Sequence, residues 1–331
     1  MYKPTRQAQN RRKKSLMTGL MKWIVSLLCV LILVSFLGFL YAPIQPFKYA
    51  RNLWVTTAMT TLNHQYLAKW FFSDSEIQKI LDSNKVDTLG NSNPSLVNAF
   101  RLTNINKMEL IDVSGKGFKG YLLTVSNPSH VKVATTSHLG VRGERAEEIA
   151  KKNGAVAVIN GGAFSDPVGT GSGGNPLGIL IVDGKTVYKD SLTAYNIIGM
   201  NRENVLVLGR YTLKQIQEMG IRDAVSFGPF LVVNGKPAIT QGDGGWGIAP
   251  RTAIGQKKDG TILMLVIDGR QIGSIGATLK DVQDIMLEYG AFNVANLDGG
   301  SSSVLYYQNE IVNHPSSQYG ERYAPSFFIV K

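Results

Sequence analysis

The segment from Ile262 to Ser303 constrains the fold of this chain more than any other stretch. It begins with an apolar run, Leu263 to Ile267, that stops at Asp268. The pattern then predicts a helix over 278–290, because a Thr-x-x-Asp capping box opens it and a glycine ends it. A second apolar run leads to Asp298 and the sequence Asp-Gly-Gly-Ser. The segment is therefore predicted to form a strand, a helix and a second strand.

The two aspartates of this segment are predicted to lie at the same end of one sheet. A strand–helix–strand connection of this length favours parallel strands, so Asp268 and Asp298 would both follow strand ends, where open sheets usually bind ligands. Two carboxylates followed by glycines form a candidate site there. The alternative is that both Asp-Gly pairs are turn residues. It is weaker for Asp298, because Asp-Gly-Gly-Ser-Ser-Ser does not fit a two-residue hairpin.

An uncharged stretch near the N-terminus, Trp23 to Tyr41, is long enough to span a bilayer. Seven basic residues and no acidic residue precede it, whereas only Lys48 and Arg51 follow closely. By the positive-inside rule we expect a cytoplasmic tail over 1–22, a signal-anchor helix over 23–42 and an extracytoplasmic remainder. The alternative is a cleaved signal peptide, but the stretch is longer than an ordinary signal-peptide core and no convincing Ala-x-Ala site follows it.

The distribution of charge argues against a nucleic-acid partner. The whole chain carries a net charge of +11, but the body without the basic tail has 28 basic and 24 acidic residues. A body this mildly basic lacks the concentrated positive charge of a nucleic-acid-binding protein. The single cysteine, Cys29, lies in the apolar stretch, so the body must be stabilised without a disulfide.

Residues 43–95 are expected to form a membrane-proximal helical stalk and a linker. The stretch Phe47 to Phe72 is rich in aromatic residues, contains no Gly or Pro, and predicts a helix with a packing role. A short helix over 77–81 follows a Ser-x-x-Glu capping box, and the polar stretch 82–94 is typical of a linker. A folded domain is therefore expected over 96–331.

The folded domain is predicted to be α+β, with a mixed β-sheet core, flanking helices and several β-hairpins. Hairpin turns are predicted at Asp183-Gly184 and Asn234-Gly235, and another turn at Lys258 to Gly260. The run Ala155 to Asn160, followed by two glycines, repeats in shorter form the arrangement that ends at Asp298. Asn160 is therefore expected to project from a strand end as Asp298 does.

Glycine-rich loops supply two further features. The G-x-G-x-x-G within 169–178 precedes a hairpin instead of a helix, so we interpret it as a mobile loop and not as a dinucleotide-binding motif. Arg251 enters a predicted strand directly after the glycine-rich stretch 242–249 and Pro250. A guanidinium there could clamp an oxyanion, because its geometry matches phosphate with two parallel hydrogen bonds. The alternative is a solvated arginine at a strand end.

Six short motifs, taken in order over about residues 100–331, resemble those of the phosphodiester glycosidase family. They are Asn160-Gly-Gly-Ala-Phe164, Ser226-Phe-Gly-Pro229, Pro250-Arg-Thr-Ala-Ile-Gly255, Val266-Ile-Asp-Gly-Arg270, Asn296-Leu-Asp-Gly-Gly-Ser-Ser302 and Gly320-Glu-Arg322. Each motif is weak alone, but the ordered set is specific. The chain departs from the family at Ala163-Phe164, where two phenylalanines are usual, and its anchor and stalk lie outside the shared domain.

The resemblance implies a membrane-anchored, outward-facing hydrolase that cleaves the C1–O–P linkage of glycosyl phosphodiesters in cell-envelope or exopolysaccharide metabolism. The leaving phosphomonoester is a weak base, so the reaction needs less acid assistance than hydrolysis of an ordinary glycoside. It needs a cation at the phosphate and a carboxylate near the anomeric carbon. A glycosyl phosphate or a polysaccharide is the expected partner, besides the membrane.

The resemblance also implies roles for single residues. Asp298 is expected to be the catalytic carboxylate, as base or nucleophile according to its separation from Asp268, and Glu321 is the candidate for a second acid. Arg251 is the first candidate for holding the phosphate. Further contacts with sugar or phosphate are expected from Arg270, Arg322, Asn160, Ser301 and the glycines of both Gly-Gly motifs, which are Gly161, Gly162, Gly299 and Gly300.

No cofactor is expected to be required, although oxygen atoms of Asp268, Asp298 and Asn160 suit Ca²⁺ or Mg²⁺. No cluster of His or Cys suggests zinc. Two other functions stay open at this point. One is a metal-dependent phosphodiesterase that breaks the P–O bond, and the other is a non-catalytic protein that binds saccharide at the membrane during exopolysaccharide assembly.

Overall fold

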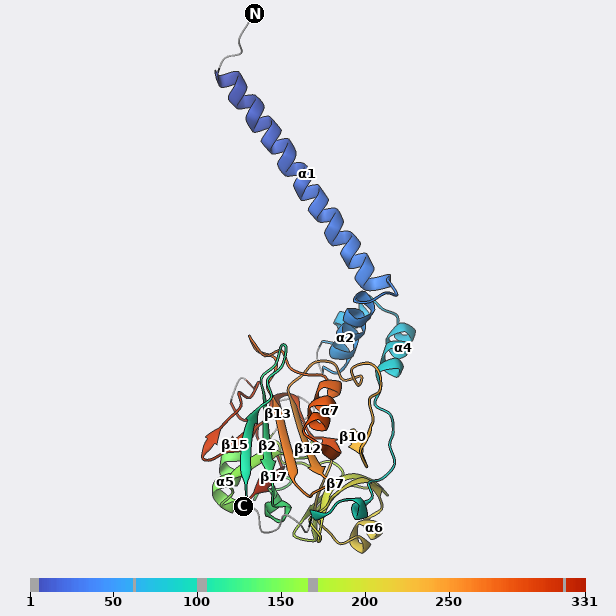
Figure 1. Cartoon of the computed structure of the whole chain (residues 1–331), viewed down its shortest axis with the longest axis vertical. Helices are drawn as coiled ribbons and strands as arrows, with labels where there is room; N and C mark the ends of the chain where they lie inside the picture. Colours follow the sequence, from blue (N-terminus) through green and yellow to red (C-terminus); the bar gives the residue numbers. More distant parts are fainter. Residues whose placement is uncertain (1–5, 62–63, 100–105, 166–171, 318–319) are drawn as a thin grey trace, which may run out of the picture.

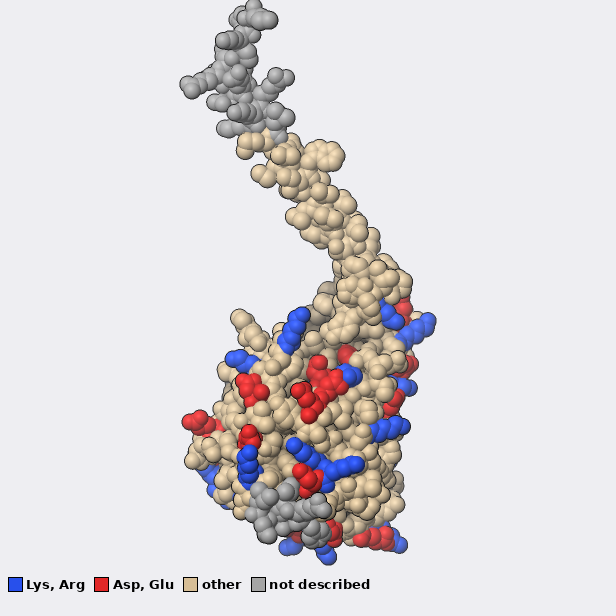
Figure 2. Space-filling view, in the orientation of Figure 1, with Lys and Arg blue, Asp and Glu red and all other residues tan. Residues whose placement is uncertain are grey.

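The structure is a computed structural model that describes residues 6–61, 64–99, 106–165, 172–317 and 320–331. A long helix, α1 (Arg6–Tyr41), leaves the body as a rod (Figure 1). Its segment Met17–Tyr41 has a mean hydropathy of 2.8 and is long and apolar enough to cross a membrane, a test that a signal sequence would also pass. In Figure 2 charged side chains are spread over the face of the body that is shown.

The expected α+β fold is confirmed, with three antiparallel sheets in the part of the chain that is described. The first sheet has the order β1-β2-β13-β12-β14-β10-β11 and comprises β1 (Met108–Asp112), β2 (Gly120–Val125), β13 (Ile262–Ile267), β12 (Arg251–Lys257), β14 (Ala291–Asn296), β10 (Phe230–Val233) and β11 (Lys236–Pro237). The second comprises β16 (Glu310–Ile311), β15 (Leu305–Tyr307), β4 (Ala157–Asn160), β17 (Ser326–Val330) and β3 (Val131–Thr135). The third comprises β6 (Lys185–Lys189), β5 (Ile179–Val182), β9 (Ile221–Ser226), β7 (Tyr195–Asn201) and β8 (Leu206–Tyr211).

Burial on both faces explains why β13 is apolar throughout. Leu263, Leu265 and Ile267 pack on the helix α7 (Leu279–Glu288), whereas the alternate residues enter the central core that all three sheets share. Successive side chains of a strand point to opposite faces, so a strand covered on both sides has no polar positions. The helices α5 (Ala146–Asn153) and α6 (Leu213–Glu218) pack in the same way on the outer faces of the second and third sheets.

The strand–helix–strand segment has the predicted direction but an extra strand in the middle. β13 and β14 are both antiparallel to β12, which lies between them, so they are parallel to each other without being neighbours. The capping box of α7 is present, since Thr278 Oγ1 accepts from Asp281 N and Asp281 Oδ2 accepts from Thr278 N. Asp268 and Asp298 therefore follow strands that end on the same side of the sheet.

The predicted turns are also confirmed. Asp183-Gly184 and Asn234-Gly235 have positive φ at both residues, as a tight hairpin turn requires, and they join β5 to β6 and β10 to β11. The turn at 258–260 joins β12 to β13. Residues 166–171 of the loop predicted to be mobile lie outside the described residues. In its described part, Ser172 and Gly174 accept hydrogen bonds from Gly143 and Gly140.

The prediction of a single helix from Phe47 to Phe72 is wrong. α2 (Phe47–Met59) and the short α3 (Tyr66–Lys69) are separate helices. The hydroxyls of Thr60 and Thr61 donate to backbone carbonyls of the last turn of α2, and Thr61 Oγ1 accepts from His64 N at 3.0 Å. Threonine side chains that bond to nearby backbone compete with the helical ladder, which explains the break.

The rest of the stalk and linker packs along the body. α4 (Asp74–Asn84) begins at Ser73 with the predicted capping box and runs three residues beyond the predicted end at 81. After a 3-10 turn of Pro94–Leu96 the chain enters the body. Asp87 N donates to Ala238 O at 2.9 Å and Ser92 N donates to Leu208 O at 2.7 Å, so the polar stretch is held against β-strand residues. The boundary near residue 95 stays a prediction.

Candidate functional site

Three of the predicted site residues meet at one end of the first sheet. Asp268 and Asp298 follow β13 and β14, and Arg251 begins β12, which runs between these two strands in the opposite direction. Arg251 pairs with Ile267, the residue that precedes Asp268. The antiparallel central strand therefore places an arginine where its two parallel neighbours place aspartates.

The carboxyl group of Asp298 lies in a largely desolvated environment. Burial raises the pKa of Asp298 to about 6, against the lowering effects of the Ser302 hydroxyl and the Gly299 N–H. Gly299 N donates to Asp298 Oδ1 at 3.0 Å, and part of the residue stays accessible. A carboxylate with a pKa near neutrality can exchange a proton at physiological pH, as a catalytic base must.

Asn160 holds the backbone of Asp298 instead of facing solvent. Its Nδ2 donates to Asp298 O at 2.5 Å, and its Oδ1 accepts from Thr252 Oγ1 at 2.8 Å and from Val304 N at 3.2 Å. Asp298 N in turn donates to Gly161 O at 3.2 Å. The two similar helix–strand units thus meet at their strand ends. With its amide engaged and only 1 % of its surface exposed, Asn160 acts as a positioning residue.

The first Gly-Gly motif allows close packing. A Cβ atom on Gly161 would lie 2.8 Å from Ser326 O, and one on Gly162 would lie 2.7 Å from Ser226 O. These distances are shorter than van der Waals contact, so a larger residue at Gly161 would push against β17 and one at Gly162 against β9. The structure therefore explains both glycines without a contact to substrate.

Two arginines converge on the second Gly-Gly motif. A Cβ atom on Gly300 would lie 3.3 Å from Nη1 and Nη2 of Arg270, so that guanidinium lies directly over the loop that follows Asp298. Arg322 Nη1 donates to Ser301 Oγ at 3.1 Å, and its guanidinium stacks on Phe164. Burial lowers the pKa of both arginines, which remain cations at neutral pH. Arg270 also adopts a φ of 60°, which is uncommon for a residue with a side chain and is concentrated at functional sites.

Both arginines line a cavity of about 950 Å³ together with Gly299, Gly300 and Ser301. The opposite wall is formed by α2 and the segment after it, including Trp54, Thr57, Thr61 and His64. The sequence predicts only a packing role for this helix, whereas in the structure it also forms a wall of the cavity. A signal was available in its aromatic composition, but its place in the site depends on how the helix packs over the end of the sheet.

Arg251 does not offer the expected oxyanion clamp. It is 4 % exposed, and its Nε and Nη2 donate to the carbonyls of Ala277, Trp246 and Gly247 at 3.1, 2.9 and 2.6 Å. Burial, together with the nearby charge of Arg270, lowers the pKa of Arg251 to about 10. These contacts fix the glycine-rich loop before β12. The structure thus gives Arg251 a positioning role, and Arg270 and Arg322 are better placed for a phosphate.

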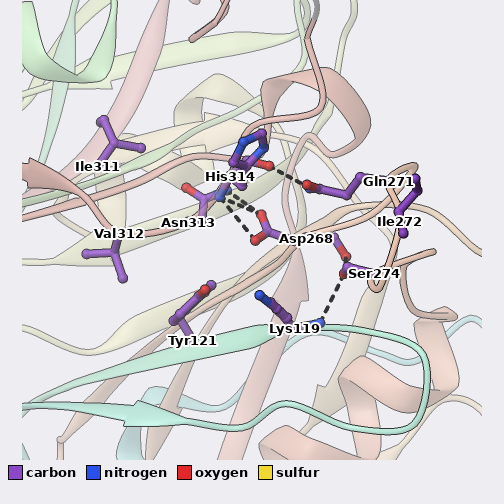
Figure 3. Close-up of a pocket in the computed structure, with 10 residues that line it drawn as sticks. All are labelled: Lys119, Tyr121, Asp268, Gln271, Ile272, Ser274, Ile311, Val312, Asn313 and His314. Carbon is purple, nitrogen blue, oxygen red and sulfur yellow. Dashed lines mark hydrogen bonds between the residues drawn. The ribbon is translucent and has the colours of Figure 1, made fainter.

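Asp268 borders a different cavity, of about 360 Å³ (Figure 3). Its Oδ1 accepts from Asn313 Nδ2 and from His314 N, both at 2.9 Å. Lys119 and Tyr121 lie on the other side of the carboxylate in Figure 3. Burial raises the pKa of Asp268, while Asn313 and His314 oppose the rise. This cavity shares no lining residue with the larger one, and Asp298 lines neither of them.

Glu321 caps a helix. Its Oε2 accepts from Ala146 N at 2.8 Å and from Glu147 N at 3.4 Å, the first backbone N–H groups of α5. A carboxylate at a helix N-terminus satisfies unpaired N–H groups and complements the helix dipole. Burial raises the pKa of Glu321, opposed mainly by the Ala146 N–H. Its engagement at α5 does not support a role as second catalytic acid.

The described residues contain no group of three or more His, Cys, Asp or Glu side chains that could hold a metal ion. Asp268 lines the smaller cavity, and Asp298 is not among the residues that line either one, so neither cavity brings their oxygen atoms together as a Ca²⁺ or Mg²⁺ site would require. The larger cavity offers two cations and a loop of small residues, and Asp298, whose pKa is raised, is the residue directly before that loop.

The model of the phosphodiester glycosidase family matches residues 153–331, just over half of the chain. The chain belongs to that family. The match includes β4 with Asn160 and the whole of the first sheet's β12, β13 and β14. The arrangement of Asp298, Arg270 and Arg322 thus lies within the matched region.

Two known relatives match about half of this chain and are much longer. An uncharacterized SPbeta prophage-derived protein of Bacillus subtilis, YomE, is 30 % identical over 55 % of this chain and 29 % of its own length. The bovine N-acetylglucosamine-1-phosphodiester alpha-N-acetylglucosaminidase is 26 % identical over 51 % of this chain and 34 % of its own length. The match therefore spans about a third of each relative.

One solved structure shows the same fold. The catalytic domain of the zebrafish N-acetylglucosamine-1-phosphodiester alpha-N-acetylglucosaminidase, described as auto-inhibited by its pro-peptide, has a TM-score of 0.57 and 24 % identity. The likeness covers 68 % of this chain and 82 % of that one. It therefore extends beyond the region that the family model matches.

Proposed function

We propose that this chain is a membrane-anchored hydrolase, facing out of the cytoplasm, that cleaves the C1–O–P linkage of glycosyl phosphodiesters. The observation that carries the proposal is the convergence of Arg270 and Arg322 on the loop directly after Asp298. Two cations beside one perturbed carboxylate suit a substrate with an anionic phosphodiester next to an anomeric carbon. Family membership supports the same reaction class.

In the proposed reaction, water adds across the bond between the anomeric carbon and the phosphate oxygen. The C1–O bond breaks, the oxygen of water joins C1, and one proton of water ends on the solvent or the released phosphomonoester. Arg270 and Arg322 stabilise the charge that develops on the leaving phosphate. Asp298, ionised above a pKa of about 6, receives the proton of the attacking water or attacks C1 itself.

The proposed location rests on α1 and on the charge before it. The helix Met17–Tyr41 is apolar enough to cross a membrane, and all seven basic residues of the first 22 lie on one side of the uncharged stretch. By the positive-inside rule the N-terminus is cytoplasmic and the body faces outward. Substrates would then be glycosyl phosphodiesters of the cell envelope or of exopolysaccharide metabolism.

The test uses the full chain in lipid nanodiscs with the methyl phosphodiester of N-acetylglucosamine 1-phosphate, a probe chosen from the name of the bovine relative. We expect free sugar to be released, and Asp298→Asn to reduce kcat by at least about 100-fold. Glu288→Gln on the exposed end of α7 is the matched control, because it also removes one carboxylate charge.

Isotope labelling separates the remaining alternatives. Hydrolysis in ¹⁸O-water places the label in the sugar when C1–O breaks. Label in the phosphate would instead identify a phosphodiesterase that breaks P–O. Binding of the probe without turnover would identify a saccharide-binding protein, and sugar release by Asp298→Asn at the wild-type rate would overturn the assigned catalytic residue.

A further inference from the structure

The large cavity has two chemically different sets of lining residues. Arg270, Arg322 and the loop 299–301 form a cationic, polar set, as described above. The other set, called the apolar end, includes apolar side chains from α2, α3 and two loops of the body, namely Leu53, Trp54, Ala58, Leu67, Ile248 and Ile275. The polar Thr57, Thr60, Thr61 and His64 also line the cavity. No acidic residue is among the described residues that line it. The cavity therefore matches a ligand with an anionic group joined to an apolar chain.

The apolar end is continuous with the helix that could cross a membrane. Trp54 lines the cavity, and its ring lies 6.1 Å from the ring of Phe39 near the end of α1, in an edge-on arrangement. Trp54 Nε1 also donates to Leu67 O at 3.2 Å, which joins α2 to α3. One side chain thus touches both the apolar helix and the cavity.

A second contact fixes the geometry of this junction. Arg51 Nη1 donates to the carbonyls of Leu40 and Ala42 at 3.1 and 3.2 Å, groups at the C-terminal end of α1 that no further helical turn satisfies. Arg51 and Trp54 lie one turn apart on α2, so the same helix holds the end of α1 and forms the cavity wall. The cavity cannot move far from the membrane face if α1 is inserted.

The rim of the apolar end is open to the surroundings. Trp54 is 41 % exposed and Ile275 is 57 % exposed, although both also line the cavity. Large apolar side chains exposed at a rim are typical of surfaces that contact lipid or another apolar partner. Tryptophan is moreover enriched at the membrane–water interface, where its ring is apolar and its N–H is polar.

We infer that the site acts on a lipid-linked glycosyl phosphodiester, in which the phosphate joins the sugar to an acyl-chain or isoprenoid alcohol. The inference rests on the proposed function and adds the identity of the leaving group. The sugar lies beside Asp298, the phosphate contacts Arg270 and Arg322, and the chain runs along α2 toward the bilayer. Water joins C1 as the C1–O bond breaks, so the products are a free sugar and a lipid monophosphate that stays in the membrane.

The test compares phosphodiesters of N-acetylglucosamine 1-phosphate that differ only in the alkyl alcohol. The full chain in nanodiscs is assayed with methyl, hexyl and decyl esters below their micellar concentrations. A fully buried methylene can raise affinity about fourfold, so with partial burial we expect kcat/KM to rise at least about tenfold from methyl to decyl. The measured quantity is the ratio of kcat/KM for decyl to that for methyl.

Variants locate the chain in the cavity. Leu53→Gln and Ile275→Gln place a polar group at the apolar end, and each should lower the decyl-to-methyl ratio at least about threefold. Leu96→Gln removes a leucine that is 48 % exposed and does not line the cavity, so the ratio should stay at the wild-type value. Circular dichroism of each variant checks that the fold is retained.

The outcomes distinguish the inference from the function on which it rests. Hydrolysis of all esters with equal kcat/KM would overturn the lipid-linked substrate and leave the glycosidase activity standing. A chain-length effect that persists in Leu53→Gln and Ile275→Gln would show that partition into the nanodisc, not the cavity, favours long chains. Failure to hydrolyse any ester, with tight binding of decyl phosphate that both variants weaken, would retain the lipid site and reject the activity.

Discussion

The guanidinium of Arg270 lies over Gly300, so closely that a Cβ atom there would be 3.3 Å from both Nη1 and Nη2. Gly300 also has a φ of 61°, in the region that favours glycine. The second Gly-Gly motif therefore makes room for a cation beside Asp298. This relationship links two motifs, Asp-Gly-Arg and Asp-Gly-Gly-Ser, that are 30 residues apart in the chain and adjacent in the site.

Gly300→Ala should impair catalysis more than folding. The added methyl group displaces the Arg270 guanidinium, and we expect kcat/KM to fall at least about tenfold, as misplacement of a binding group does. Strain at the positive φ should lower the free energy of unfolding by about 1–2 kcal/mol. Gly184→Ala is the matched control, with a φ of 77° and nothing within 4 Å of the new Cβ. It should lose similar stability and keep full activity; equal losses of activity would contradict the role of Gly300.

The arginines at the sheet end should separate into two classes. Arg251→Ala leaves the carbonyls of Ala277, Trp246 and Gly247 without their buried donor, so the free energy of unfolding should fall by about 2–4 kcal/mol. Arg270→Ala should instead leave the free energy of unfolding within about 1 kcal/mol and reduce kcat/KM by at least about 100-fold. Urea unfolding and steady-state kinetics measure the two effects. A catalytically impaired but fully stable Arg251→Ala would restore Arg251 as a phosphate ligand.

Activity should depend on pH through Asp298. Because the carboxylate must be ionised to act as base or nucleophile, kcat/KM should fall about tenfold per pH unit below a pKa of about 6 and be constant above it. The initial rates of methyl-ester hydrolysis between pH 4 and pH 8 give the profile. A flat profile across pH 5 to 7 would show that Asp298 does not titrate in the step that is measured.

Stability should show the opposite trend at Asp298. Its pKa is about 6 in the folded chain and about 3.9 in the unfolded chain, so between pH 4 and pH 6 the folded state binds more protons. The free energy of unfolding should therefore fall as pH rises through that window, by up to about 3 kcal/mol from this group. Urea titrations at pH 4 and pH 7.5 measure this fall in the free energy of unfolding, and Asp298→Asn should lack the contribution that residue 298 makes to it. A steeper fall in Asp298→Asn than in wild type would contradict the raised pKa.

Asp268 should prove structural. Asp268→Asn keeps an oxygen that can accept from Asn313 and His314, so kcat/KM should stay within about threefold and the free energy of unfolding should fall by about 1 kcal/mol. Asp268→Ala leaves both donors unpaired and should lower the free energy of unfolding by about 2–3 kcal/mol. Loss of activity by 100-fold in Asp268→Asn at unchanged stability would bring Asp268 back into the catalytic machinery.

Glu321 should contribute to stability through α5. Glu321→Ala removes the acceptor for the first N–H groups of the helix, and the free energy of unfolding should fall by about 1 kcal/mol. Glu321→Gln keeps an acceptor and should recover part of that stability. Both variants should hydrolyse the methyl ester at close to the wild-type rate, and a large drop in kcat for Glu321→Gln would identify it as an acid catalyst.

Much of the fold could be predicted because its signals are local. The apolar run of β13, the capping box at Thr278 and the turns at 183–184 and 234–235 each depend on a few neighbouring residues. The break between α2 and α3 escaped prediction, since it depends on which backbone groups Thr60 and Thr61 bond to. The strand β12 between β13 and β14 also escaped, because a strand's place in a sheet depends on pairing across the chain.

The sequence by itself determined the family, the apolar helix over 23–42 and the motifs that supply the site. Only the tertiary structure decided which side chains of those motifs are free to act. Arg251, Asn160, Asp268 and Glu321 have the right chemistry, but neighbours distant in sequence already use their hydrogen-bonding groups. Residue type and motif order are local properties of the chain, whereas the satisfaction of a buried polar group depends on what folds against it. The same reason gives α2, with no catalytic motif of its own, a wall of the cavity.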